Sequence, residues 1–220
     1  MSRAAGLEPP RWRDVLPALG DRAEHAGELG EYFLADLWTA RRVYEARPER
    51  HVDVGSRIDG LVAHLATFLT VEVVDVRPAR STIEGIQFVQ ADATRLAGIT
   101  ASPSVSSIHA LEHFGLGRYG DTLDPAGHIK GLRALQTLVA PGGSLYVGVP
   151  VGRPRVEFNA HRVLAPGFAP SILDALRLVE FCAIVNGGLE QKLAPDAVEN
   201  EDYAFGLYHF AYDREPNSRA

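Results

Sequence analysis

The sequence has very little cysteine and no long uninterrupted hydrophobic run. With a single cysteine, Cys182, among 220 residues, no disulfide bond can form within the chain, and a reducing compartment fits this composition. No segment reaches the roughly 18 consecutive apolar residues that a membrane-spanning helix requires. The first residues also lack the charged and then apolar pattern of a secretory signal. These absences predict a cytoplasmic protein without a membrane span.

Basic residues are scarce as well, and lysine is almost missing. The chain has 22 Lys and Arg against 28 Asp and Glu, a formal net charge of −6, and its only lysines are Lys130 and Lys192. Nucleic-acid surfaces are built from clustered Lys and Arg, so this balance argues against a nucleic-acid partner. The hydrophobic content of 46% is ordinary, and the length suits one α/β domain with a sizeable core.

Residues 51–75 predict a strand, a tight turn, a helix and a second strand. A β-branched run breaks at Gly55, apolar residues then recur at helical spacing, and a second apolar run ends in Asp75. A glycine at the first turn lets the backbone approach a ligand. An acid at the end of the second strand can accept both hydroxyls of a ribose. The unit therefore predicts a cofactor that contains a nucleoside.

The spacing of the glycines separates two kinds of cofactor. No further glycine lies between Gly55 and Gly60, whereas a pyrophosphate cradle for a dinucleotide needs the pattern G-x-G-x-x-G. An acid two residues before the glycine, as in Asp53-Val-Gly55, instead suits a ligand with an amino group and no phosphate. An ordinary strand-to-helix turn of another α/β protein is the alternative.

Further apolar runs predict the rest of an α/β sheet. We expect strands at residues 86–90, 105–109, 144–150, 177–185 and 203–212 and helices at 23–47, 124–139 and 170–176. We also expect a polar loop at 151–162 and an acidic, exposed segment at 189–202. The chain divides into a flexible N-terminal arm at residues 1–22, a helical cap at 23–48, a main domain at 49–213 and a disordered tail at 214–220.

Several of these stretches resemble the class I S-adenosylmethionine (SAM)-dependent methyltransferases. Asp53-Val-Gly55 resembles the first motif of that superfamily, and Leu138-Val-Ala-Pro-Gly-Gly143 resembles the entry to its fifth strand. The resemblance implies an α/β, Rossmann-like fold, with a seven-stranded and mostly parallel sheet that has helices on both faces, over roughly residues 50–212. Residues 30–38, 51–60, 111–121 and 156–162 also resemble a bacterial branch of uncharacterised function that is often associated with surface-polysaccharide gene clusters.

The resemblance implies that the cofactor binds at the carboxyl ends of the first four strands, where open α/β sheets bind ligands. Asp53 would hold the methionine ammonium, Asp75 the ribose hydroxyls and Asp92 the adenine amino group, while His109 and Ala110 would flank the methyl donor. The full set of expected SAM-binding residues is Asp53, Gly55, Ser56, Arg57, Asp75, Val76, Asp92, Ala93, His109 and Ala110.

Two members of this set have alternative roles. Asp92 is equally suited to capping the following turn through Thr94. Arg57 can pair with Asp59, bind the methionine carboxylate, or remain a solvated surface arginine.

Methylation of an oxygen needs a base for the hydroxyl proton, and the exit of the fourth strand carries candidates. His113 is the predicted base, because an unperturbed histidine titrates near pH 6.5, and Glu112 can orient it or act alone. Asp121 and His161 are further catalytic candidates. A polar helix start with Glu112 and His113 solvated is the alternative. The spacing of the histidines does not favour a metal site, and none is predicted.

Together these residues predict a SAM-dependent methyltransferase that acts on a hydroxyl of a small polar acceptor. The acceptor class is a sugar, nucleotide sugar or natural product, in polysaccharide or glycosylated natural-product biosynthesis. Two alternatives stay open: an enzyme of this fold with non-methylating chemistry (a pericyclase, isomerase or lyase) and a non-catalytic binding protein. Formation of a homodimer also stays open.

Overall fold

The computed structural model describes residues 11–14, 29–78, 82–96 and 98–213. The predicted arm at 1–22 lies outside the described residues except for 11–14, which contain the short 3-10 helix η2 (Trp12–Asp14). The predicted tail at 214–220 also lies outside them. Of the predicted helical cap, residues 29–48 are described, and they contain α1 (Glu31–Ala46).

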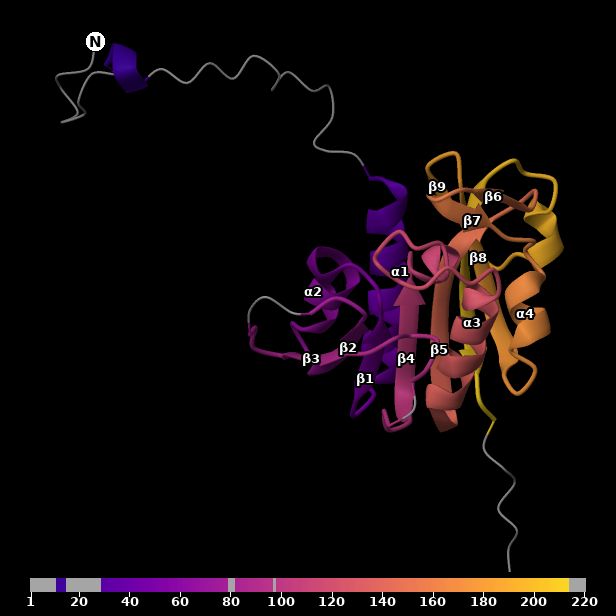
Figure 1. The fold of residues 1–220 in the computed structure, drawn as a ribbon, viewed down its shortest axis with the longest axis horizontal. Coiled ribbons are helices and arrows are strands. Elements are labelled where there is room, and N and C mark those ends of the chain that lie inside the picture. The colour runs from indigo at the N-terminus through magenta and orange to yellow at the C-terminus, as the bar shows by residue number, and fades with distance from the viewer. Residues whose placement is uncertain (1–10, 15–28, 79–81, 97, 214–220) are drawn as a thin grey trace, which may run out of the picture.

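An eight-stranded sheet forms the centre of the main domain, in the order β3-β2-β1-β4-β5-β10-β8-β9 (Figure 1). Its strands are β1 (His51–Val54), β2 (Val71–Asp75), β3 (Ile86–Gln90), β4 (Ser102–Ile108), β5 (Val139–Val151), β8 (Arg177–Val185), β9 (Gly188–Glu190) and β10 (Ala204–Ala211). The strands from β3 to β5 in this order pair in parallel, and β10 is antiparallel to both of its neighbours. The mostly parallel α/β sheet is confirmed, with eight strands rather than the predicted seven.

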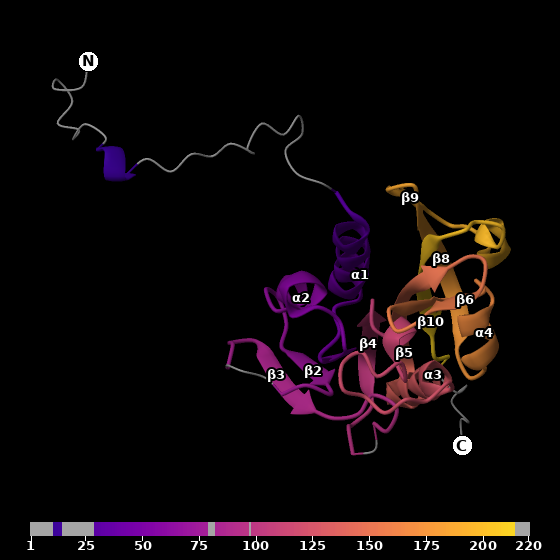
Figure 2. The ribbon, with the colours of Figure 1, turned by 45° about the horizontal axis from the view of Figure 1, so that its top comes forward.

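Helices cover both faces of this sheet, as Figures 1 and 2 show. One face carries α1, the π-helical turn η3 (Ile58–Val62) and α2 (Ala63–Leu65); the other carries α3 (Gly127–Leu138) and α4 (Phe168–Ile172). Each face has its own apolar core. Successive side chains of a strand point to opposite faces, so Leu145 and Val147 pack in the core beneath α3 while Tyr146 packs in the core beneath α1.

The predicted polar loop at 151–162 and the predicted acidic segment at 189–202 both contain short strands. Residues 151–162 include β6 (Arg155–Glu157) and the start of β7 (His161–Val163), which pair as an antiparallel hairpin. Residues 189–202 include most of β9, which pairs with β8, and the 3-10 helix η5 (Pro195–Val198). The loop prediction for 151–162 is wrong at β6 and β7, and β9 is not predicted, because strands of three residues are too short to show a periodic pattern.

Within the described residues, no helix has the length and apolar character needed to cross a bilayer.

Candidate active site

The carboxyl ends of β1, β2, β3 and β4 border a cavity of about 1190 Å³. Nine of the ten residues predicted to bind the cofactor line it: Gly55, Ser56, Arg57, Asp75, Val76, Asp92, Ala93, His109 and Ala110. They meet because parallel strands place the residues that follow them at one edge of the sheet. Gly55 has a φ of +77°, and a Cβ there would lie 3.0 Å from the Cβ of Ala110, so this turn requires glycine.

Asp53 is the exception, because it lies beneath the loop and not in the wall of the cavity. Its Oδ1 accepts the Ser56 N–H at 3.0 Å, and its Oδ2 accepts the hydroxyls of Ser56 at 2.6 Å and Ser106 at 2.5 Å. Burial raises the pKa of Asp53 to about 6, against the opposing effect of these hydrogen bonds. The carboxylate is fully buried, and it fixes the loop that follows β1.

Asp75 ends β2, and its carboxylate is bound by Arg77. The backbone N–H and Nε of Arg77 donate to Oδ1 at 2.8 and 2.9 Å, and Nη2 donates to Oδ2 at 2.7 Å. Burial raises the pKa of Asp75, but the hydrogen bonds from Arg77 outweigh it and the pKa lies below its ordinary value. The same guanidinium lies 4.9 Å from the centroid of the Tyr119 ring.

The two alternative roles left open by the sequence are both present. The Oδ1 of Asp92 accepts the backbone N–H of Thr94 at 2.9 Å and its hydroxyl at 2.7 Å, which is a capping arrangement. Arg57 pairs with Asp59, with Nε–Oδ1 and Nη2–Oδ2 distances of 3.1 and 2.7 Å. Both residues nevertheless line the cavity.

His109 forms the inner wall of the cavity between two aromatic rings. Its ring stacks on Tyr32 from α1 at 3.9 Å and on Phe205 from β10 at 3.7 Å. Burial lowers the pKa of His109 to about 3, so the ring is neutral at physiological pH. The sequence analysis assigns no site role to Tyr32. The feature that could have marked it is its place as an aromatic residue near the start of the predicted helical cap.

Glu112 and His113 lie in the 3-10 helix η4 (Leu111–His113), directly after β4. The Nδ1 of His113 is 2.6 Å from the carbonyl oxygen of Ala160, which places the proton on Nδ1 and leaves the lone pair on Nε2. That Nε2 is 3.7 Å from Oε1 of Glu112. Burial lowers the pKa of His113 to about 4 and raises that of Glu112 to about 8. Both side chains are buried, so the alternative of a solvated helix start is wrong.

The other two catalytic candidates lie in different places. Asp121 lines the cavity, and its carboxylate accepts the backbone N–H groups of Gly115, Gly117 and Tyr119 at 2.8, 3.2 and 3.2 Å, which shapes this loop. His161 lies on the β6–β7 hairpin, outside the cavity lining, with Nε2 3.4 Å from Oε2 of Glu157. No group of three His, Cys, Asp or Glu side chains within the described residues is arranged to hold a metal ion.

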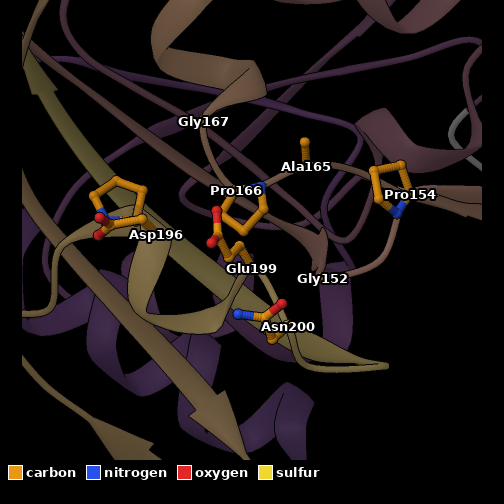
Figure 3. A pocket seen from close by; sticks show the side chains of 9 residues that line it. Gly152, Pro154, Ala165, Pro166, Gly167, Asp196, Glu199 and Asn200 are labelled. Atoms are coloured by element: carbon orange, nitrogen blue, oxygen red, sulfur yellow. The ribbon is translucent and has the colours of Figure 1, made fainter.

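A second cavity of about 620 Å³ lies elsewhere, between the end of β5, the segment before α4 and η5. Its lining is Gly152, Pro154, Ala165, Pro166, Gly167, Pro195, Asp196, Glu199 and Asn200 (Figure 3). It contains no residue that the sequence marks as a site residue. The cavity at the strand ends is therefore the candidate active site.

Comparison with solved structures establishes the class I methyltransferase fold. The N-methyltransferase NodS from Bradyrhizobium japonicum WM9, in complex with S-adenosylhomocysteine (SAH), has 16% identity and a TM-score of 0.58, over 83% of this chain and 88% of that chain. The 1,6-didemethyltoxoflavin-N1-methyltransferase of Burkholderia thailandensis, also solved with SAH, has 13% identity and a TM-score of 0.59, over 82% of this chain and 79% of that chain. The 4+2 cyclase SpnF has 12% identity and a TM-score of 0.58, over 82% of this chain and 81% of that chain.

At the level of sequence, the chain belongs to the family described as "Caenorhabditis protein of unknown function, DUF268", which matches residues 66–187, more than half of its length. No curated protein matches the sequence.

Proposed function

We propose that this chain is a SAM-dependent methyltransferase and that the cavity at the ends of β1 to β4 holds the cofactor. The observation that carries the proposal is a cavity bordered by a glycine turn and by carboxylates, without a glycine-rich phosphate cradle. Its volume of about 1190 Å³ is ample for a nucleoside cofactor with a small acceptor beside it. NodS and the toxoflavin methyltransferase, which share the fold, were solved with SAH.

The lining residues fit the parts of the cofactor. Asp75 would hold the ribose hydroxyls and Asp92 the adenine amino group, while the turn at Gly55 admits the ligand close to the backbone. The neutral ring of His109 and the methyl group of Ala110 would border the methyl donor. Bound SAM supplies an electrophilic methyl group, and the cavity wall orients it toward the acceptor.

The turn after β4 would handle the acceptor's proton. We propose that the acceptor is a small polar molecule with a hydroxyl group, such as a sugar, nucleotide sugar or natural product. His113 would take the hydroxyl proton at Nε2, while Ala160 fixes its Nδ1–H. Glu112 lies beside Nε2, and its ionised form would stabilise the protonated imidazole. Because burial raises the pKa of Glu112 to about 8, the rate of methyl transfer should rise as the pH increases through that value.

Calorimetry with SAM, SAH and NAD tests the cofactor. SAM and SAH should bind and NAD should not, and Asp75→Asn should weaken SAH binding about tenfold or more. A matched control is Asp213→Asn, because Asp213 is also paired with an arginine but lies outside the cavity lining. If neither SAM nor SAH bound the wild-type chain, the proposal would fail.

Mass spectrometry of the product tests the reaction. Methyl transfer adds one methylene to the acceptor, whereas a product without this gain would indicate non-methylating chemistry. The fold is compatible with such chemistry, since SpnF is a cyclase.

A further inference from the structure

The proposed function places a ribose at a carboxylate that the protein itself already occupies. An ionised carboxylate offers about four lone-pair positions, and Arg77 takes three of those on Asp75 with its backbone N–H, Nε and Nη2. A ribose diol that donates to both oxygens needs two positions. The cofactor and Arg77 therefore compete for Asp75, and the guanidinium must move when the cofactor binds.

Arg77 has a second partner close by. Its guanidinium lies 4.9 Å from the centroid of Tyr119, and Arg118 lies 5.3 Å from the same ring. Tyr119 is 41% exposed and lines the cavity together with both arginines. Two guanidinium groups are thus already gathered at one aromatic side chain on the loop after η4.

Arg118, unlike Arg77, contacts no carboxylate among the described residues, although its charge opposes the rise in the pKa of the buried Glu112. Its Nη1 donates to the carbonyl of Ala160 at 2.8 Å, and within the described part of the chain it forms no ion pair. The acids of its own loop are engaged: Asp121 accepts three backbone N–H groups, and Asp124 pairs with Lys130 at 2.5 Å. The charge of Arg118 is available to a ligand.

We propose that Arg77 changes partner when the cofactor binds, and that it then forms, with Arg118 beside Tyr119, a subsite for an anionic group of the acceptor. The inference rests on the proposed function. The ribose hydroxyls replace Arg77 at Asp75, and the released guanidinium is left without a counter-ion. A carboxylate or phosphate on the acceptor restores the ion pair, because guanidinium groups bind both anions through two parallel hydrogen bonds.

The exchange couples the two ligands. The cofactor weakens the hold of Asp75 on Arg77, so it strengthens the binding of the anion, and linkage requires that the anion strengthen the binding of the cofactor by the same factor. An acceptor with a carboxylate or phosphate would therefore bind after the cofactor. A neutral acceptor would gain nothing from the exchange.

The first test measures SAH binding by calorimetry in the wild-type chain and in Arg77→Gln. SAH is used because it lacks the sulfonium charge that an arginine would repel. Removal of the competing arginine should tighten SAH binding about twofold to fivefold, the range that a partly exposed ion pair supports. Arg177→Gln is the control, since it breaks a similar two-point ion pair with Asp213. Unchanged or weaker SAH binding in Arg77→Gln would overturn the exchange.

The second test asks whether an anion strengthens the binding of SAH. The dissociation constant of SAH is measured in sodium chloride, sodium phosphate and sodium acetate at one ionic strength. Phosphate or acetate should lower the dissociation constant of SAH at least twofold in the wild-type chain. The more effective of the two anions indicates whether the acceptor carries a phosphate or a carboxylate. Arg77→Gln should abolish the effect, because the coupling passes through this arginine, and Arg118→Gln should weaken it by removing the second guanidinium of the subsite. Equal SAH affinity in all three salts would overturn the anion subsite, whereas a wild-type chain that bound no SAH would refute the proposed function itself.

Discussion

Replacing Glu112 by glutamine should remove a loss of stability that the wild-type chain suffers as the pH rises from 4.5 to about 8. The side chain is buried, its Oε2 has no hydrogen-bond partner among the described residues, and burial raises its pKa from 4.5 to about 8. Between these two values the folded chain holds a proton that the unfolded chain has released. The free energy of unfolding therefore falls as the pH rises through this window. A displacement from 4.5 to about 8 corresponds to on the order of 5 kcal/mol.

Several ionisable groups surround Glu112, and Arg118 and Glu31 both act on its pKa, so the comparison of wild type and variant is what isolates Glu112. The Nδ1 of His109 lies 3.8 Å from Oε1 of Glu112 and 3.8 Å from Oε1 of Glu31 on α1. The Nε2 of His113 lies 3.7 Å from Oε1 of Glu112. Their titrations contribute to the pH dependence of both proteins. Glutamine keeps the shape of the side chain and removes its ionisation, so the difference between the two profiles reports Glu112.

Urea unfolding followed by far-UV circular dichroism, at intervals between pH 5 and pH 9, measures this difference. Glu112→Gln and the wild type should have similar stability near pH 5, and the variant should be more stable by several kcal/mol near pH 9. Glu190→Gln, at an exposed position on β9, serves as the control and should follow the wild type throughout. Parallel profiles for Glu112→Gln and the wild type would refute the reasoning, because Glu112 would then titrate alike in the folded and unfolded chains. The same variant should also lack the rise in methyl-transfer rate near pH 8.

Two further variants test packing and the cavity wall. Gly131→Ala would place a Cβ 2.6 Å from the ring of Phe114, so we expect a loss of about 1–3 kcal/mol in urea unfolding, whereas Gly167→Ala, with no atom within 4 Å, should change little. Equal stability of these two variants would contradict the packing argument. Tyr32→Ala removes the ring that stacks on His109 and should weaken SAH binding about threefold to tenfold in calorimetry. Tyr44→Ala, at an exposed position of the same helix, should bind SAH as the wild type does, and a similar loss in both would argue against a specific role for Tyr32.

The sequence predicts the elements that carry a long periodic signal. The strands at β1 to β5, β8 and β10 are all marked by apolar runs, and the glycine at residue 55 marks the turn that borders the cavity. The three-residue strands β6, β7 and β9 carry no such signal. β6 and β7 pair with each other outside the central sheet, and β9 pairs with β8 at its edge, so these strands depend on contacts with a partner rather than on a pattern of their own.

The site residues are predicted by position more successfully than by contact. Strand order brings nine of the ten residues predicted to bind the cofactor to one cavity, but side-chain direction decides what each one touches. The hydrogen bond from Ser106 to Asp53 joins neighbouring strands, and no local pattern announces it. The occupation of Asp75 by Arg77 is local, yet a sequence shows only that the two residues are two positions apart. Physical contact between such groups is a property of the folded sheet.

The place of β10 in the sheet links folding to the site. This strand is late in the chain, but it is inserted between β5 and β8 and pairs with both along its length. Until it is in place, two strand edges lack partners, which makes a chain cut before Ala204 a candidate for aggregation. Phe205 also belongs to this strand and is stacked on His109. During synthesis, the stacked wall of the cavity at His109 is therefore complete only after β10 has paired with β5 and β8.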